Sequence, residues 1–239
     1  MSIGEQQEYL EEQARNESKF NRNAFEHLHK HAQSEPHNAW LRDELQKMQA
    51  YIAVCGDGGV NKRRSILKAD VEKKLNGLKL EYHQRRRAYG KQLIDDTLDT
   101  IAKKDHKSSS ERLADLMETQ TRIAAMTNDE LVALADRAKS ENKRELCTAF
   151  RSETEANAAI VELRRRGESE RADVTRQMIQ KVPAAAIGDE DAGRKLAYAD
   201  DLWRTEDTDA AYLHDEQGRR YGVDMDALID TSPLENVPE

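Results

Sequence analysis

The longest regular pattern of apolar positions runs from Lys62 to Lys104. Apolar residues recur there at steps of three and four, or multiples of these, which places them on one stripe of an α-helix and excludes the alternation of a strand. The pattern predicts one helix of about 43 residues, which spans about 65 Å at roughly 1.5 Å per residue. Its stripe consists of Leu67, Val71, Leu75, Leu78, Tyr82, Tyr89, Leu93 and Ile101.

This predicted helix needs partners along its stripe. It is longer than a compact domain of this mass can bury, so we expect neighbouring helices of the same chain, other subunits or both to cover it. Gly77 and Gly90 lie inside the run, and each costs about 1 kcal/mol relative to Ala, which favours a bend or a break there. Arg85 and Arg86 interrupt the stripe midway, which argues against a simple two-stranded coiled coil.

Two further helices are predicted before the long one. Residues 4–33 are polar with sparse apolar positions, so we expect this segment to be ordered mainly by packing on something else. Ser34 as N-cap and Pro36 at an early helical position start the next helix, which ends at the glycine-rich turn 55–59. Because glycine tolerates positive φ, this turn predicts an antiparallel hairpin with the long helix.

Short helices joined by short loops are predicted for residues 108–182. Ser108 with Glu111, and Thr127 with Glu130, have the spacing of a capping box, so helices are expected to start near 109 and 128. Later runs end at Gly167 and before Pro183. The apolar positions of the first of these helices are Leu113, Leu116, Met117, Ile123 and Met126.

The chain changes character after residue 182. Residues 183–239 are acidic but hold four of the twelve aromatic residues, which a disordered acidic tail usually lacks. A short helix is expected over 194–204. The turn signal 215–218, between Tyr212 and Tyr221, predicts a short β-hairpin. Because an isolated hairpin is marginal in water, the hairpin either docks on a partner or the tail stays loosely ordered.

The composition agrees with a mostly α-helical chain that has a thin core. Hydrophobic residues make up 37% and charged residues 35% of the 239 residues, whereas usual domains have about 45–50% and about 25%. We expect an elongated multi-helix protein with one long basic helix, a small helical bundle and a short β-hairpin near the C-terminus. Its segments are a helical hairpin region with the long basic helix (1–107), the bundle (108–182) and an acidic, aromatic-containing tail (183–239).

Charge is distributed in opposite blocks. Residues 62–91 contain eleven Lys or Arg and three acids, a net charge of +8, although the whole chain carries −8. Residues 183–239 contain fifteen acids and five bases, a net charge of −10. Such blocks favour pairing, within the molecule or between copies.

Motifs of catalysis and metal binding do not fit the chain. The glycine-rich turn 56–59 lacks the spacing of a phosphate-binding P-loop. His27 and His31 would share a helix face as two zinc ligands, but a third ligand is missing. Asp224, Asp226 and Asp230 resemble part of a calcium loop, but its central Gly and closing Glu are not in register, so a calcium site is rejected. We therefore expect no enzyme activity, no cofactor and no metal.

The sequence favours a soluble protein that stays in the cytoplasm. No apolar run approaches the roughly 18 residues of a membrane span, and no apolar signal segment follows a charged start. Cys55 and Cys147 stand apart without metal-type spacing, so we expect free buried thiols and no disulfide framework. We expect no membrane partner.

The long basic helix is the strongest functional signal, and two kinds of partner fit it. Lys and Arg that meet phosphates would give nucleic acid affinity with little sequence discrimination. Because the bases point in different directions around the helix, an acidic protein partner is favoured, including the C-terminal block of another copy. We expect a non-enzymatic structural or assembly protein that acts within a larger complex. The alternative is a nucleic-acid-binding accessory protein whose acidic tail suppresses loose binding.

This hypothesis assigns candidate contact residues. The packing seam is the set of apolar residues expected to be buried against protein partners. It consists of Leu67, Val71, Leu75, Leu78, Tyr82 and Leu93. The electrostatic contacts are Arg63, Arg64, Arg85, Arg86 and Arg87, and the anchors for a partner surface are Trp203, Tyr212 and Tyr221. In general style, and through no specific motif, the chain resembles small, charged, helical accessory proteins of tailed phages or mobile elements, such as assembly factors or internal virion components. The resemblance implies a place in the virion if a phage encodes the protein.

Overall fold

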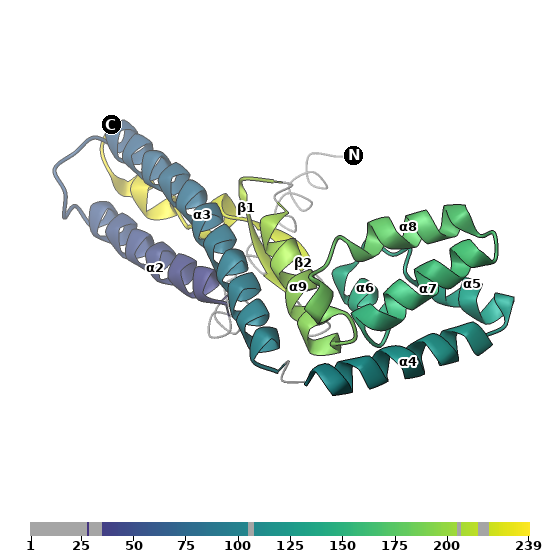
Figure 1. The fold of residues 1–239 in the computed structure, drawn as a ribbon. Helices are drawn as coiled ribbons and strands as arrows, with labels where there is room; N and C mark the ends of the chain where they lie inside the picture. The colour runs from purple at the N-terminus through teal and green to yellow at the C-terminus, as the bar shows by residue number, and fades with distance from the viewer. Residues whose placement is uncertain (1–27, 29–34, 105–107, 205–206, 215–219) are drawn as a thin grey trace, which may run out of the picture. The chain divides into compact units, whose positions relative to one another are not determined.

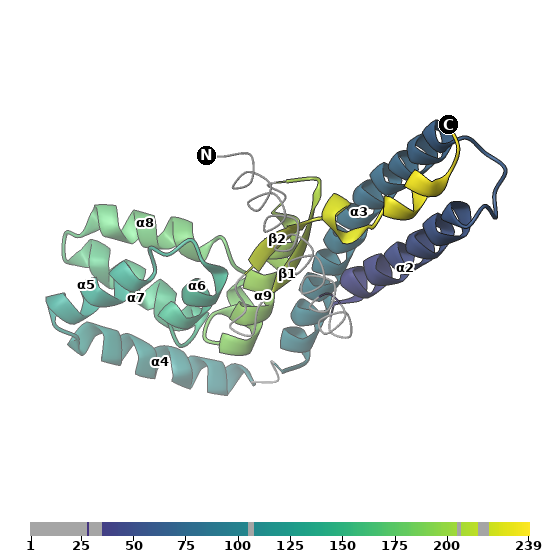
Figure 2. The same cartoon turned by 180° about the vertical axis from the view of Figure 1, so that it is seen from behind.

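The protein is mostly α-helical, as predicted, in a computed structural model that describes residues 28, 35–104, 108–204, 207–214 and 220–239. These residues form eight α-helices and a two-stranded antiparallel sheet (Figures 1 and 2). The helices are α2 (Pro36–Gly56), α3 (Arg64–Lys104), α4 (Ser109–Ala125), α5 (Asn128–Arg137), α6 (Lys143–Ala149), α7 (Glu153–Arg165), α8 (Ser169–Ile179) and α9 (Glu190–Trp203). The strands are β1 (Ala210–His214) and β2 (Arg220–Asp224), and the short 3-10 helices are η1 (Ala184–Ala186), η2 (Asp226–Leu228) and η3 (Ser232–Asn236). The polar helix predicted over 4–33 lies outside the described residues, apart from Leu28.

The chain divides into two compact units whose limits differ from those of the three predicted segments. The first unit combines residues 1–87 with 205–239, and the second comprises residues 88–204. The end of the chain thus folds with its first helices, because its apolar residues join the same core. Helix α9, expected in the acidic tail, belongs to the second unit.

The predicted helical hairpin is the frame of the first unit. Helix α2 begins at Pro36, and α3 continues through Gly77 and Gly90 as one helix. Between them, Gly58 has a φ of 78°, the left-handed conformation for which glycine is suited. Helix α2 and the first part of α3 lie side by side in both views (Figures 1 and 2). Their shared core includes Leu41, Leu45, Met48, Ile52, Leu67, Val71, Leu75 and Tyr82.

The C-terminal segment completes this core. Strands β1 and β2 pair with Ala211 opposite Val223 and Leu213 opposite Tyr221, which confirms the predicted hairpin; residues 215–219 are outside the described part. Helix η3 packs on α2 where a side chain at Gly56 would collide with Pro233. The buried apolar residues that this segment adds are Ala211, Leu213, Val223, Met225, Leu234 and Val237.

The second unit is a bundle of short helices whose starts follow the predicted caps. Ser108 with Glu111 and Thr127 with Glu130 form both capping boxes, so α4 and α5 begin where the sequence predicts. Asn142 and Ser152 cap α6 and α7 in the same way, each accepting a hydrogen bond from a backbone N–H of the first turn. These caps satisfy amide groups that a helix start otherwise leaves unpaired.

Close backbone approaches hold α6, α9 and the loops of this unit together. Gly188 has a φ of 93° and donates its N–H to the Cys147 carbonyl at 2.6 Å. Gly193 brings α9 against α6, where a side chain would meet Cys147 and Arg144. Burial raises the pKa of the Cys147 thiol to about 11, so it stays protonated at neutral pH. Among the described residues, no helix combines the length and the apolar character that crossing a bilayer requires.

Candidate protein-interaction surface

The predicted packing seam is covered by the chain's own residues. Leu67, Val71, Leu75 and Tyr82 are buried in the core that α3 shares with α2 and the C-terminal segment, and Leu78 packs partly buried against it. Leu93, in the second unit, is half-buried. The stripe was expected to be covered by helices of the same chain, by other subunits or by both. Along the first unit, the same chain covers it. The seam stays a prediction as a contact with other proteins.

The predicted electrostatic contacts split into internal and exposed groups. Arg64 donates to the Val237 carbonyl at 2.9 Å and pairs with Glu235 at 3.2 Å. Arg85 is paired with Glu81 and lies over the Trp40 ring, and Arg86 is buried, with its guanidinium 4.5 Å from the centre of the Tyr212 ring. The remaining two predicted contacts, Arg63 and Arg87, are exposed.

Opposite charge blocks pair within the molecule. Lys68 meets Glu235 at 2.5 Å, and the Lys79 ammonium lies 3.1 Å from Asp209 and 2.9 Å from Asp226. Burial alone would lower the pKa of Lys79, but hydrogen bonds to Asp226 and Asp209 outweigh it and hold this pKa above its usual value. Acids of the C-terminal block thus neutralise several bases of α3.

The predicted aromatic anchors belong to two different units of the chain. Tyr212 is buried in the first unit and Tyr221 is half-buried there. Trp203 closes α9 in the second unit and is 47% exposed. Tyr212 instead has an internal role, because the guanidinium groups of Arg86 and Arg220 lie over its ring, 4.5 and 5.0 Å from the ring centre.

A buried polar network fixes β1 on the α2–α3 pair. The Tyr82 hydroxyl accepts the Tyr212 backbone N–H at 2.9 Å and donates to Asn38 Oδ1 at 3.0 Å. Asn38 also donates to the Tyr212 carbonyl at 3.3 Å. Burial raises the pKa of Tyr82 well above its usual value, which keeps the hydroxyl a donor. Helix spacing alone assigned Tyr82 to the apolar stripe and gave no sign of this network.

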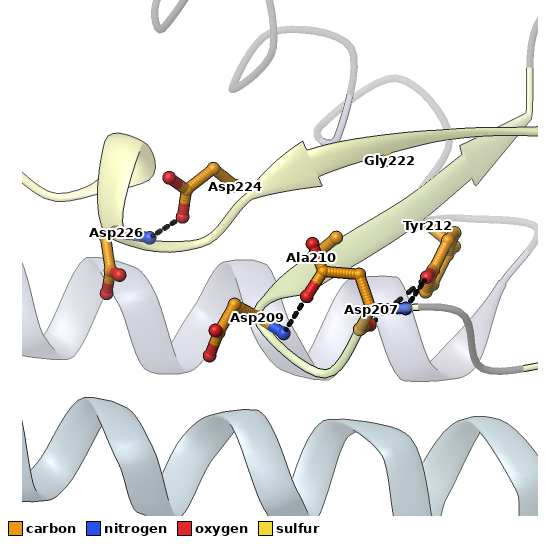
Figure 3. A pocket seen from close by; sticks show the side chains of 7 residues that line it. All are labelled: Asp207, Asp209, Ala210, Tyr212, Gly222, Asp224 and Asp226. Atoms are coloured by element: carbon orange, nitrogen blue, oxygen red, sulfur yellow. Dashed lines mark hydrogen bonds between the residues drawn. The ribbon is translucent and has the colours of Figure 1, made fainter.

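An acidic cleft lies beside the hairpin, lined by Asp207, Asp209, Ala210, Tyr212, Gly222, Asp224 and Asp226 (Figure 3). Two of its aspartates stabilise turns, because Asp207 accepts the backbone N–H of Asp209 and Asp224 that of Asp226. Asp209 and Asp226 are the partners of Lys79. The cleft therefore has an internal structural role.

No metal centre forms in the described part of the chain, where no group of three His, Cys, Asp or Glu is placed to hold an ion. The histidines considered as zinc ligands, His27 and His31, lie outside the described residues. Asp224 and Asp226 serve the turn after β2, as the acidic cleft indicates.

The second unit exposes an apolar surface that the sequence reading did not identify. Leu113, Leu116 and Met117 of α4 are 57%, 37% and 62% exposed, and Val161 of α7 is 67% exposed. A groove of about 500 Å³ between the two helices joins Leu116 to Val161 and is lined further by Gln120, Ile123, Ala124, Glu153, Thr154, Asn157, Ala158 and Glu162. We call Leu113, Leu116, Met117, Val161 and this groove the α4–α7 surface.

Helix α4 is held mainly at its C-terminal end. Of its seventeen residues only Ile123 is buried. Arg166 donates to the carbonyls of Ala124 and Met126, at 3.3 and 2.8 Å, and so binds the free C-terminal end of α4. Glu162 orients Arg166, and its hydrogen bonds with Arg165 and Arg166 lower the pKa of this carboxyl to about 2. Arg122 pairs with the buried Glu155 of α7 at 2.8 Å.

A signal for this surface was present in the sequence. Leu113 and Ile123 are ten positions apart, which at 100° per residue places them about 80° apart around the helix, and Met117 lies further from Ile123 still. One core-facing stripe does not accommodate all three. The sequence places Leu113, Met117 and Ile123 in one apolar set, but the structure buries only Ile123 among the residues of α4.

Comparisons of the chain with protein families, with curated proteins and with solved structures give no match.

Proposed function

We propose that the protein is a non-enzymatic structural or assembly protein that acts through protein contacts within a larger complex. The observation that carries this proposal is the α4–α7 surface. Large exposed apolar side chains gathered on one face are typical of protein-interaction sites, whereas single exposed ones are ordinary. Of the seventeen residues of α4, only Ile123 is buried by the described part of the chain, and most helical stability in proteins comes from packing.

The remaining parts of the proposal rest on the sequence. The charged, thin-cored composition supports an accessory component of a phage virion or mobile element, located in the cytoplasm or in the virion. Partners are copies of this chain, other subunits of the assembly, or both. Coiled-coil-like helix packing on a partner is the form of contact that α4 is suited for.

Site-specific photocrosslinking in the cells that carry the gene tests the proposal. A photoreactive benzoylphenylalanine replaces Met117 or Val161 in the surface, and Gln177, exposed on α8 of the same unit, is the matched control. The proposal predicts protein crosslinks from positions 117 and 161 that far exceed those from 177. Equal yields from the three positions, or none at 117 and 161, would contradict it.

A second candidate function is nucleic-acid binding by the basic helix, with the acidic segment as an internal competitor. Arg64, Lys68 and Lys79 form ion pairs with C-terminal acids, as an internal competitor for the basic helix would. These pairs favour the candidate, because phosphates of a nucleic acid would have to displace the acids in order to bind. The same segment also buries apolar residues such as Leu213 and Leu234 in the core, which makes its release costly. This burial favours the first proposal.

A DNA titration separates the two functions. Glu235→Gln removes the partner of Lys68 at an exposed position, and Glu153→Gln removes the same charge from the second unit. The second candidate predicts that Glu235→Gln binds duplex or single-stranded DNA more tightly than Glu153→Gln, with affinity that falls steeply between about 50 and about 200 mM salt. The first proposal predicts no DNA binding by either variant.

A further inference from the structure

The ring of His83 lies in the contact between α3 and the segment that leads into β1. His83 is 6% exposed, and its Nε2 lies 2.9 Å from the Thr208 carbonyl oxygen, so the neutral ring donates there. Its Nδ1 is buried without a hydrogen-bond partner among the described residues. The ring meets Tyr82 and Tyr212 edge-on, with centroids 5.2 and 6.3 Å apart. This setting accommodates a neutral imidazole.

The positive charges close to His83 disfavour its protonation, because a protonated ring would add a further cation beside them. On α3, Arg86 and Arg87 follow in the next turn, and Arg86 is buried against the same Tyr212 ring. From the segment before β1, Asp207 is the facing acid. From α2, His37 contacts Tyr82 with centroids 5.7 Å apart, and Glu35 lies near the Tyr82 hydroxyl. Asp209 is engaged by Lys79.

We propose that His83 is an acid-sensitive latch: its protonation favours opening of the segment Thr208–Tyr212 from α3. The closed state pairs only one of the two ring nitrogens, and a protonated ring is a donor at both. In the open state, water solvates the protonated His83 ring, and the ring lies further from the positive charge of Arg86. By linkage, the state that binds the proton more tightly gains population as the pH falls.

The direction of the pH dependence follows from the titration of His83. Burial, with Arg86 and Arg87, lowers the pKa of His83 in the closed state, and the hydrogen bond to Thr208 and the charge of Asp207 only partly offset this. In the open state the pKa returns to about 6.5. The closed state is therefore fully favoured above about pH 6.5 and loses up to about tenfold in population ratio per pH unit below it, until the lowered pKa is reached.

Opening would expose basic side chains of α3. The same segment contains Asp209, which neutralises Lys79, and Tyr212, which covers Arg86. Acidification would therefore increase the positive charge that α3 presents to solvent. This consequence does not depend on the α4–α7 surface or on the function proposed for it.

Hydrogen exchange of the full-length protein at pH 7.5 and 5.5, corrected for intrinsic rates, tests the latch. In the wild type, protection of peptides covering 208–213 should fall several-fold at pH 5.5, with peptides of α7 as the internal reference. His83→Gln keeps a donor for the Thr208 carbonyl and removes the titration, so its protection of 208–213 should change no more than that of α7. A wild-type loss that persists in His83→Gln would overturn the proposal.

A measurement on the wild type decides the question if His83→Gln fails to fold. The imidazole proton resonances of His83, followed by NMR between pH 8 and 5, report its titration in the native protein. The latch predicts a midpoint below the ordinary value of about 6.5. A midpoint at or above that value would overturn it, because protonation would then not favour the open state.

Discussion

At the scale of single residues, the first unit depends on polar side chains in positions that look apolar by spacing. Tyr82 falls on the helical stripe of α3, but its hydroxyl links α2 to β1 through Asn38 and the Tyr212 backbone. Arg86 interrupts the stripe and fills the gap with a guanidinium on the Tyr212 ring. Periodicity locates such residues but does not reveal the partners, which come from α2 and from a segment more than a hundred residues away.

Replacing Tyr82 with Phe should weaken the first unit. The ring remains, but the Tyr212 backbone N–H and Asn38 Oδ1 lose a buried partner, which costs about 1–3 kcal/mol. Urea unfolding followed by circular dichroism measures the loss. An unchanged free energy of unfolding would show that the network contributes nothing to stability.

Two glycines of the second unit provide a matched pair for backbone conformation. Gly167 and Gly188 have φ of 87° and 93°, but only at Gly188 would a Cβ overlap the Arg151 carbonyl. Gly167→Ala should cost about 1–2 kcal/mol from the left-handed conformation alone. Gly188→Ala should cost more than about 3 kcal/mol, because the clash must also be relieved. Thermal unfolding compares them; similar losses would show that the loop at Gly188 adjusts freely.

At the scale of elements, local sequence signals predicted helix starts well and helix surroundings poorly. The capping boxes at Ser108 and Thr127 and the glycine turn near Gly58 lie where expected, since each signal is satisfied within a few residues. The β-hairpin was also predicted from its own residues. The packing of η3 on α2 depends on a distant part of the chain, and no local pattern encodes it.

The two capping boxes should differ in their effect on stability. Thr127→Ala removes the cap of α5, which buries Leu131 and Ala135, so it should cost the second unit about 1 kcal/mol. Ser108→Ala removes the cap of α4, which buries only Ile123, so the helix start should fray with a smaller loss. Urea unfolding of both variants makes the comparison. Equal losses would show that α4 folds as cooperatively as α5.

At the scale of the whole molecule, charge and composition predicted the fold class and the pairing of opposite blocks, but not the division of the chain. The sequence separates residues 1–107, 108–182 and 183–239 by composition. The first compact unit instead combines α2 and the first part of α3 with the C-terminal segment. Apolar residues such as Val223 and Leu234 are spaced too sparsely in the acidic block for the sequence to mark it as part of a core. The helical content was predictable; which segment covers α3 was not.

Acids of the C-terminal segment neutralise several bases of α3 within the first unit. The α4–α7 surface is therefore the feature that most requires a partner. Some bases that the sequence predicts as contacts with a partner are used inside the first unit, as Arg64 and Arg86 illustrate. Among the described residues, Leu113, Leu116 and Met117 of α4 have no equivalent covering. We therefore propose that the second unit makes the interaction and that the first part of the basic helix has an internal structural role.

The most direct measurement is hydroxyl-radical footprinting of Met117 in its native cells and in the purified chain. We predict that oxidation of Met117 falls several-fold in the cells relative to the purified protein, because a partner covers the α4–α7 surface there. Leu80, which is 64% exposed in the first unit, should change little and serves as the reference. Equal oxidation of Met117 in both settings, relative to Leu80, would contradict the proposed interaction.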